Sequence, residues 1–349
     1  MPEVARSPLF EVLARIPQRE GELPALVPTL ELDALMVQCA RHGVSAYVGD
    51  AFARAQVTLP AAAQSALSLD ARGTVARGAK NKRLLLAVLD ALAAQNVTPI
   101  VLKGLGLATR LYDSPLSRPS TDVDVLIVPT QMPVVHQVLI AMGLVAQADP
   151  ALGDVLEEHH HHAFAGPAGL VEVHFRLFAG FGMASYDDAA VQARAWSANL
   201  ERRAVRYLSA EDEFLYLAVH AANHAFLRAS WLVDLQRFAI QTPPRWERVA
   251  ELAREVGFTV PYAAALDALS TALQAPVPEV AREAAGHRGV RHVVHRWLFS
   301  ARHLGSARLA EGALAPFLIR LWLVDSPARG VTQFLGGLRR LVRRAASRS

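Results

Sequence analysis

The chain has 349 residues, a formal net charge of +4 and an apolar fraction of 52%, a balance that excludes global disorder and the collagen-like and low-complexity classes. The length indicates two or three structural units, and the mild basic excess weakly favours anionic partners. The single cysteine, Cys39, excludes an internal disulfide and a cysteine zinc site, so we expect a cytoplasmic protein.

The first part of the chain is predicted to be helical. Residues 31–56 contain two amphipathic patterns that break near Gly43, and residues 61–95 carry leucines at helical spacing. The start of the chain lacks the long apolar segment of a signal peptide, and no run of about 18 apolar residues indicates a membrane span. We therefore expect an N-terminal helical region over residues 1–96 and no membrane partner.

The pattern changes at Val97, where strand-like segments begin to alternate with short helices. Strands are predicted at 97–104, 121–128 and 144–148, and helices at 105–112 and 131–142. The segments HHHAFAG and LVEVHFRL flank Gly-Pro-Ala-Gly, which predicts a β-hairpin. We expect these elements to form an α/β core over residues 97–208.

Residues 209–349 are again predicted to be helical. Ser209 is suited to cap a helix that runs through residue 226. Further helices are predicted near residues 231–240, 245–256, 261–273, 278–286, 290–302 and 314–324. The predicted fold class is α+β, with a mixed sheet and its flanking helices between N- and C-terminal helical regions.

The sharpest local signal is the pair Asp122 and Asp124. Residues two apart in a strand face the same side, so both carboxylates project together, while Val123, Val125 and Ile127 face the other way. Two acids side by side in an apolar strand repel each other, and a divalent cation removes that cost. Oxygen ligands suit Mg²⁺ or Mn²⁺, so the pair predicts a metal site.

A later strand supplies a third carboxylate. In residues 170–177, Glu172, His174 and Arg176 alternate with apolar side chains and share one face. A strand with one face in solvent shows the same alternation. Glu172 alone therefore does not distinguish a functional site from a solvent-facing strand. Together with the aspartate pair, it favours a functional site.

A third signal lies upstream, where a predicted strand ends in Lys103-Gly104 and a helix begins. Free backbone N–H groups at a helix start bind phosphate, and glycine permits close approach. Such turns are common, so this one gains its meaning from the order: a glycine turn, a short helix, an acid-x-acid strand, then a third acid on a later strand.

This combination resembles the nucleotidyltransferase superfamily that includes DNA polymerase β and the aminoglycoside nucleotidyltransferases. More narrowly, KGLGLATRLYDSPLSRPSTDVDVLI is similar to a bacterial group of uncharacterised nucleotidyltransferases, as are VEVHFRL and HAANH…WLVDL. The resemblance covers about residues 30–240. It implies a polymerase β-like nucleotidyltransferase core for the α+β fold.

The resemblance also implies a mechanism and a site. Asp122, Asp124 and Glu172 would be the catalytic residues and hold Mg²⁺ or Mn²⁺, and a nucleoside monophosphate would pass from a nucleoside triphosphate (NTP), with ATP expected first, to a hydroxyl of a small molecule or protein. The residues expected to bind the nucleotide are Lys103, Gly104, Arg118, Ser120, Thr121 and His174.

One departure from the superfamily pattern leaves alternatives open. Leu105 follows Gly104 where the superfamily usually has a serine that contacts phosphate. Lys103 or Arg118 could replace that contact electrostatically, and the sequence does not decide which. The alternatives are a kinase-like phosphoryl transferase on the same fold and a non-catalytic protein that binds a nucleotide or a partner.

Two histidine groups were weighed as metal sites. In the run His159–His162, successive strand residues face opposite sides, so a fortuitous or structural run is favoured, with His161 or His162 near the site face. His220 and His224 share a helix face, and a zinc site there would need a third ligand such as Asp234. Packing of that face on the core is the favoured interpretation.

Other candidates are weaker. Phe214, Tyr216, Trp231 and Phe238 are expected in the core rather than against a nucleobase. Arginines at residues 339–348 form a basic stripe, for which a solvated helix end is favoured over contact with lipid or nucleic acid. Without an RNA-binding or helix-turn-helix signature, no nucleic-acid partner is predicted.

Overall fold

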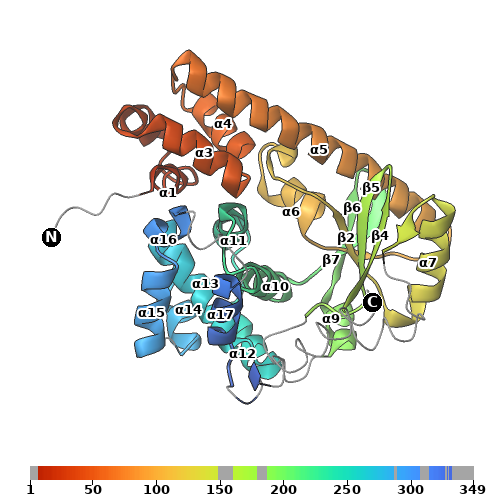
Figure 1. Ribbon diagram of the computed structural model, residues 1–349. Coiled ribbons are helices and arrows are strands. Elements are labelled where there is room, and N and C mark those ends of the chain that lie inside the picture. Colours follow the sequence, from red (N-terminus) through yellow and green to blue (C-terminus); the bar gives the residue numbers. More distant parts are fainter. Residues whose placement is uncertain are drawn as a thin grey trace, which may run out of the picture.

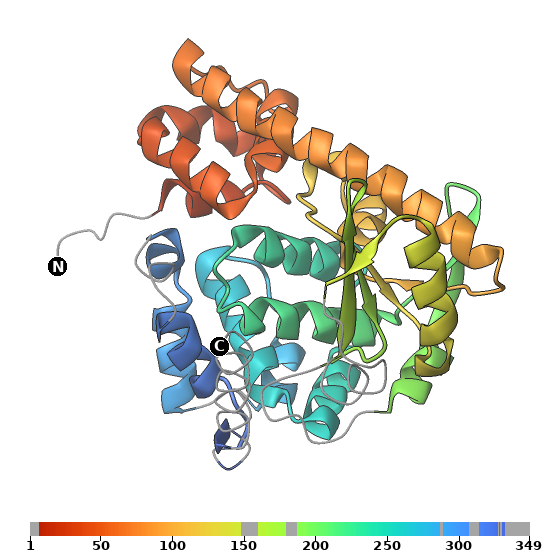
Figure 2. The same ribbon diagram turned by 45° about the vertical axis from the view of Figure 1, so that its right-hand side comes forward.

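The computed structural model describes residues 7–147, 160–178, 187–286, 289–306, 314–326, 328 and 330–331. One long helix, α5, runs from a group of N-terminal helices to a β-sheet, and the C-terminal helices pack below the N-terminal group and beside the sheet (Figure 1). The turned view shows the same arrangement (Figure 2). The arginine stripe at 339–348 lies outside the described residues.

The N-terminal helices follow the predicted pattern. Their bounds are α1 Pro8–Leu13, α2 Leu23–Leu26, α3 Leu32–His42, α4 Ser45–Arg54 and α5 Ala61–Ala93. Gly43 ends α3 with φ +69°, a left-handed conformation that favours glycine, so the predicted break between two amphipathic helices is confirmed.

The described residues form a mixed, seven-stranded sheet in the order β3-β4-β5-β2-β1-β7-β6. The strands are β1 Ile100–Val101, β2 Val123–Leu126, β3 Val145–Ala146, β4 His161–Gly166, β5 Gly169–His174, β6 Trp196–Leu200 and β7 Arg203–Tyr207. Only the β2–β5 and β1–β7 pairs are parallel. The predicted hairpin is confirmed as β4–β5, and the predicted α+β class is confirmed.

The β6–β7 hairpin was not predicted from the sequence. β7 pairs in parallel with β1, and the indole Nε1–H of Trp196 donates to the Leu208 carbonyl at 3.0 Å. The β6 strand has mostly exposed residues, so its alternation is weak and period-two reasoning has little to detect.

Most helices of the core and of the C-terminal part agree with the predicted pattern. The bounds of the helices in these parts are α6 Lys103–Leu111, α7 Met132–Ala141, α9 Asp188–Arg194, α10 Ala210–Asn223, α11 Ala229–Gln241, α12 Trp246–Val256, α13 Thr259–Ala272, α14 Glu279–Ala284, α15 Val290–Leu298, α16 Ala301–Gly305 and α17 Leu314–Trp322. Helix α9 was not predicted, and the predicted helix at 290–302 is divided into α15 and α16. Ser209 caps α10 as predicted, since its Oγ accepts from the Asp212 N–H. No described helix is long and apolar enough to cross a bilayer.

Two apolar clusters divide the core at the sheet. One cluster lies between one sheet face and the helices α5 and α7, and includes Leu85, Leu89 and Val135. The other joins the N-terminal helices to the C-terminal ones, and includes Leu35 of α3 with Phe214 of α10. The division into units at residues 96 and 208 remains a prediction, because α5 packs on both the N-terminal helices and the sheet.

Candidate active site

The two acidic strands lie side by side in the sheet. β2 pairs in parallel with β5, which places Asp124 opposite Glu172 and Leu126 opposite His174. Val123 and Val171 belong to the apolar cluster under α5 and α7. Because strand side chains alternate, the carboxylates point to the opposite face, toward the C-terminal helices.

Asp124 is the most enclosed of the three acids. Its side chain is fully buried, and its Oδ1 lies 3.0 Å from Lys103 Nζ and 3.2 Å from His174 Nε2. Burial alone would raise the pKa of Asp124, but Lys103 and His174 lower it well below its usual range, so the carboxylate is ionised. Its Oδ2 is buried and has no hydrogen-bond partner among the described residues.

Asp122 lies in the loop just before β2. Burial and the neighbouring Asp124 raise the pKa of Asp122 to about 6. One atom each of Asp124, Glu172 and His174 lies within 4.8 Å of the others, a spacing that could hold a metal ion. Asp122 lies outside that close group, and Lys103 and Arg118 only partly offset the effect of burial and of Asp124 on its pKa.

The glycine turn between β1 and α6 borders these acids. Gly104 has φ +56° and ψ −135°, a conformation that disfavours any residue with a Cβ, and an added Cβ would lie 3.4 Å from Ser120 Oγ. The Ser120 hydroxyl donates to the Asp122 carbonyl at 2.9 Å, and Asn81 Nδ2 donates to the Ser120 carbonyl at 2.9 Å. The turn and the loop before β2 are therefore held together.

Lys103 is the basic residue in direct contact with the acids. Burial by itself lowers the pKa of Lys103, but Asp124 raises it above its usual range, so the ammonium is charged. Arg118 donates instead from Nε and Nη2 to the two carboxylate oxygens of Asp234, at 2.8 and 2.7 Å, and from Nη1 to the Pro119 carbonyl at 3.0 Å. Of these two basic residues, only Lys103 pairs with an acid of the proposed site.

A cavity of about 590 Å³ opens over this face of the sheet. It is lined by residues of the glycine turn, the loop before β2, strand β5 and helices α10 and α11, and they include every sequence-predicted site residue except Asp124. The size suits a small-molecule ligand. Thr121 is exposed at this cavity, while Asp124 lies beneath it.

Helices α10 and α11 form the helical wall of the cavity. Phe214, Tyr216 and Phe238 are buried in the core as expected, and Trp231 packs against the same core. Tyr216 and Trp231 also line the cavity. The signal for Tyr216 is its spacing, because Tyr216, His220 and His224 recur every four residues along α10 and share one face. The sequence-based interpretation considered His220 and His224 but did not include Tyr216, which precedes them on the same helix face.

His220 and His224 pack on Trp231, with ring centroids 5.3 and 4.9 Å away. Burial lowers the pKa of both imidazoles, so they are neutral near pH 7. Asp234, weighed as a third zinc ligand, pairs with Arg118 and accepts from the Tyr112 hydroxyl at 2.7 Å. The groups of described residues with metal-ligand spacing do not include His220 or His224.

The histidine run divides between the two sheet faces. His161 lies on the site face, 3.9 Å from Glu172 and directly opposite His174 in the β4–β5 pair. His162 is on the other face, where it packs against Phe164. His160 precedes β4 and joins His161 at the cavity, which strand alternation alone does not predict, and His159 lies outside the described residues.

The comparison with family models agrees with the expected family. The model of a family described as "Uncharacterised nucleotidyltransferase" matches residues 28–273. No curated protein matches the chain. Among solved structures, the solution structure of the antibiotic-resistance factor ANT(2'')-Ia is 14% identical over 50% of this chain and 91% of that chain, with a TM-score of 0.38.

Proposed function

Because the chain belongs to the uncharacterised nucleotidyltransferase family, we propose that it is a Mg²⁺-dependent (or Mn²⁺-dependent) enzyme that transfers a nucleoside monophosphate from an NTP to a hydroxyl. The acceptor would be a small molecule or a protein, and ATP is the first nucleotide to test. The observation that carries the proposal is the parallel pairing of Asp124 with Glu172, with Asp122 at the entry to the same strand.

The acids fit a divalent cation. Asp124 has a buried oxygen without a hydrogen-bond partner among the described residues, and the pKa of Asp122 is raised by burial and by Asp124. Asp122, Asp124 and Glu172 are therefore proposed to hold the metal, a carboxylate set that Mg²⁺ accepts together with substrate phosphates. When bound, the metal would neutralise charge on the phosphates and lower the pKa of the acceptor hydroxyl.

The surrounding residues supply binding and orientation. The backbone at Gly104 can approach the triphosphate closely, and Lys103 supplies a fixed positive charge beside it. Ser120 holds the loop in place through the Asp122 carbonyl, and Thr121 offers an exposed hydroxyl. Arg118 lines the same cavity and is held in position by its pair with Asp234. His174 fixes the orientation of Asp124 by their contact at 3.2 Å.

The proposed transfer needs one bond made and one broken. The acceptor oxygen bonds to the α-phosphorus, the bond from that phosphorus to the leaving oxygen breaks, and pyrophosphate departs. The hydroxyl proton passes to a carboxylate oxygen of Glu172, whose side chain is 21% exposed, whereas Asp124 is fully buried. Of the paired acids Asp124 and Glu172, Glu172 is thus the one that can meet a substrate in the cavity.

The test uses ATP labelled on the α- or the γ-phosphate, with Mg²⁺ and the small-molecule and protein fractions of a cell extract. Label from the α-phosphate in an acceptor, with release of pyrophosphate, supports the proposal. Label from the γ-phosphate would replace it with phosphoryl transfer. If calorimetry detects no binding of ATP, CTP, GTP or UTP with Mg²⁺ or Mn²⁺, the proposed enzymatic function is rejected.

Two variants connect that activity to the site. Asp122→Asn removes a carboxylate that is only partly buried, so we expect the fold to persist and α-label transfer to be lost. Asp90→Asn makes the same chemical change on α5, where Asp90 pairs with Arg203 at the surface, and should retain transfer. Equal activity of the two variants would mean that the acids are misassigned.

A further inference from the structure

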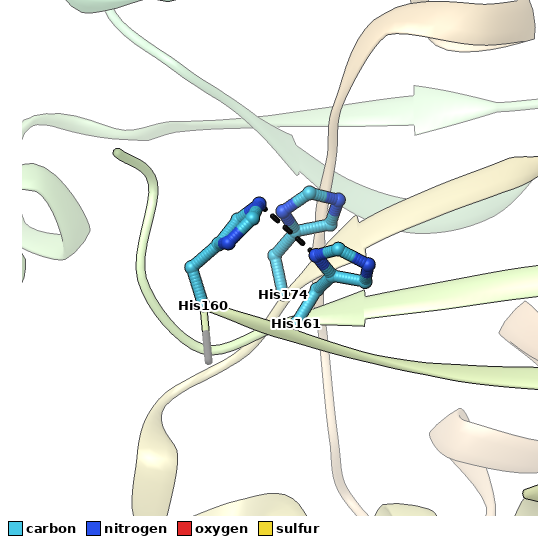
Figure 3. A group of neighbouring side chains, drawn as sticks. All are labelled: His160, His161 and His174. Atoms are coloured by element: carbon cyan, nitrogen blue, oxygen red, sulfur yellow. Dashed lines mark hydrogen bonds between the residues drawn. The ribbon is translucent and has the colours of Figure 1, made fainter. Parts of the chain in front are cut away.

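Three histidine rings converge at the edge of the cavity (Figure 3). His161 and His174 are directly opposite in the antiparallel β4–β5 pair, so their side chains share a face. His160 precedes β4, and its carbonyl accepts from the backbone N–H groups of Phe175 and Arg176 at 3.1 and 3.3 Å. Two histidines that are adjacent in sequence thus meet on one side because only one of them is within the strand.

The facing nitrogens are arranged as ligands. His161 Nδ1 lies 3.0 Å from His160 Nε2, and one nitrogen from each of the three rings lies within 4.8 Å of the others. The Nε2 of His174 faces Asp124, which leaves Nδ1 as its second nitrogen. That Nδ1 is buried and has no hydrogen-bond partner among the described residues.

Each of the two strand histidines has a carboxylate on its other nitrogen. His174 Nε2 lies 3.2 Å from Asp124 Oδ1, and His161 Nε2 lies 3.9 Å from Glu172 Oε1. Histidines that bind a metal usually donate their second ring N–H to a carboxylate, which fixes the tautomer and the ring orientation. Asp124 is therefore placed to direct Nδ1 of His174 toward His160, and Glu172 lies beside the opposite nitrogen of His161.

We propose that His160, His161 and His174 bind a zinc ion, in a site next to the carboxylate site for Mg²⁺. Imidazole nitrogens favour zinc and similar transition metals, whereas carboxylates favour Mg²⁺. Three protein ligands with a fourth position open to the cavity are typical of zinc sites that bind a substrate or water. With Zn–N bonds of about 2.0 to 2.1 Å, tetrahedral ligand nitrogens lie about 3.3 Å apart, close to the spacing of the His160–His161 pair.

The proposed zinc site would contact the proposed catalytic acids at two places, His174 with Asp124 and His161 with Glu172. Zinc on Nδ1 of His174 and of His161 would hold both rings against Asp124 and Glu172. A donor atom of the acceptor could occupy the open position, since all three histidines line the cavity that contains the proposed catalytic face. Zinc binding itself requires no nucleotide, so it can be measured independently of the proposed function.

The experiment measures zinc binding by the full chain after chelation, using calorimetry for Zn²⁺ and visible absorption for Co²⁺. We expect one ion per chain, with tetrahedral Co²⁺ bands, and at least tenfold weaker binding in His160→Gln and in His161→Gln. Both rings are half-buried at the cavity edge, so glutamine should be tolerated; circular dichroism checks the fold.

His162→Leu is the matched control, because His162 belongs to the same run but packs against Phe164 on the opposite face. It should bind zinc like the original chain. Equal binding by the original chain and the His160→Gln and His161→Gln variants would overturn the site. Loss of zinc in Glu172→Gln with no loss in His160→Gln would also overturn it, because the ion would then belong to the group formed by Asp124, Glu172 and His174.

Discussion

Arg118 and Asp234 form a buried ion pair with two parallel hydrogen bonds, from Nε to Oδ1 at 2.8 Å and from Nη2 to Oδ2 at 2.7 Å. The pair joins the loop before β2 to helix α11, so it connects the proposed catalytic strand to the helical wall of the cavity. Tyr112 donates its hydroxyl to the same carboxylate at 2.7 Å. Burial by itself lowers the pKa of Arg118, but Asp234 raises it above its usual range, so the guanidinium is firmly charged.

Asp234→Ala should destabilise the protein by about 3 to 5 kcal/mol, because it leaves the Arg118 guanidinium buried without its counterion. Denaturant unfolding measures the loss. Asp90→Ala is the control, since Asp90 forms the same two-bond geometry with Arg203 at the surface and should change stability little. Equal losses from both variants would show that burial of the Arg118 pair is unimportant.

Lys103→Met should lower NTP turnover about 10²- to 10³-fold, the usual effect of removing one preorganised charge contact from a reacting phosphate. The chain has two other lysines, Lys80 and Lys82, both on α5 and away from the acids. Lys80→Met and Lys82→Met should retain turnover. Steady-state kinetics with ATP and Mg²⁺ measures all three, and unchanged turnover in Lys103→Met would remove this residue from the site.

Gly104→Ala should weaken NTP binding and destabilise the fold by about 1 to 3 kcal/mol, since φ +56° and ψ −135° are strained for alanine. Gly143→Ala also acts at positive φ, but its Cβ would meet no atom within 4 Å and it ends α7 far from the turn. It should cost stability without changing ATP affinity. Calorimetric titration separates the two effects, and equal ATP affinity in both variants would contradict a phosphate-binding role for the Gly104 backbone.

Stability should fall in mild acid because of His42, a buried histidine at the end of α3. Its Nδ1 accepts the Ala229 N–H at 3.1 Å, and burial, with Arg41 and Arg228, lowers its pKa from 6.5 to about 3. The unfolded chain then binds more protons as the pH falls, so this contribution is complete above pH 6.5 and is lost between 6.5 and about 3. At pH 5 the loss is about 2 kcal/mol.

Unfolding free energies at several pH values test that slope. His42→Gln should reduce the difference between pH 5 and pH 8 by about the same 2 kcal/mol. His303→Gln on α16 is the control and should keep the original slope. An unchanged slope in His42→Gln would mean that other groups cause the acid sensitivity.

Most of the secondary-structure predictions that the structure confirms depend on local periodicity in the sequence. The alternation in Asp122-Val-Asp124 and in Val171-Glu172-Val173 separates polar from apolar faces over a few residues, so it is readable without knowing the partners. The glycine break at Gly43 is equally local, because it depends on one residue's backbone freedom. These features are enough to predict strands β2 and β5 and the break between α3 and α4.

Contacts between residues that are distant in the sequence could not be predicted from local patterns. Arg118 was predicted to bind the nucleotide, and its pairing with Asp234 depends on how α11 packs against the loop before β2. Tyr216 is buried in the core as expected, and its additional place at the cavity depends on which face of α10 meets the sheet. Strand alternation indicates that the histidines of the run cannot all share one face, but it does not apply to His160, which precedes the first residue of β4.

The sequence by itself determined the family and the fold class, and it led to the residues of the proposed site, because each depends on patterns within short segments. Only the tertiary structure decided the register that sets Asp124 beside Glu172, the pairing of Lys103 with Asp124 and the meeting of three histidines. The physical reason is that these contacts join residues dozens of positions apart. Their geometry follows from the packing of the whole sheet against its helices, which no local propensity encodes.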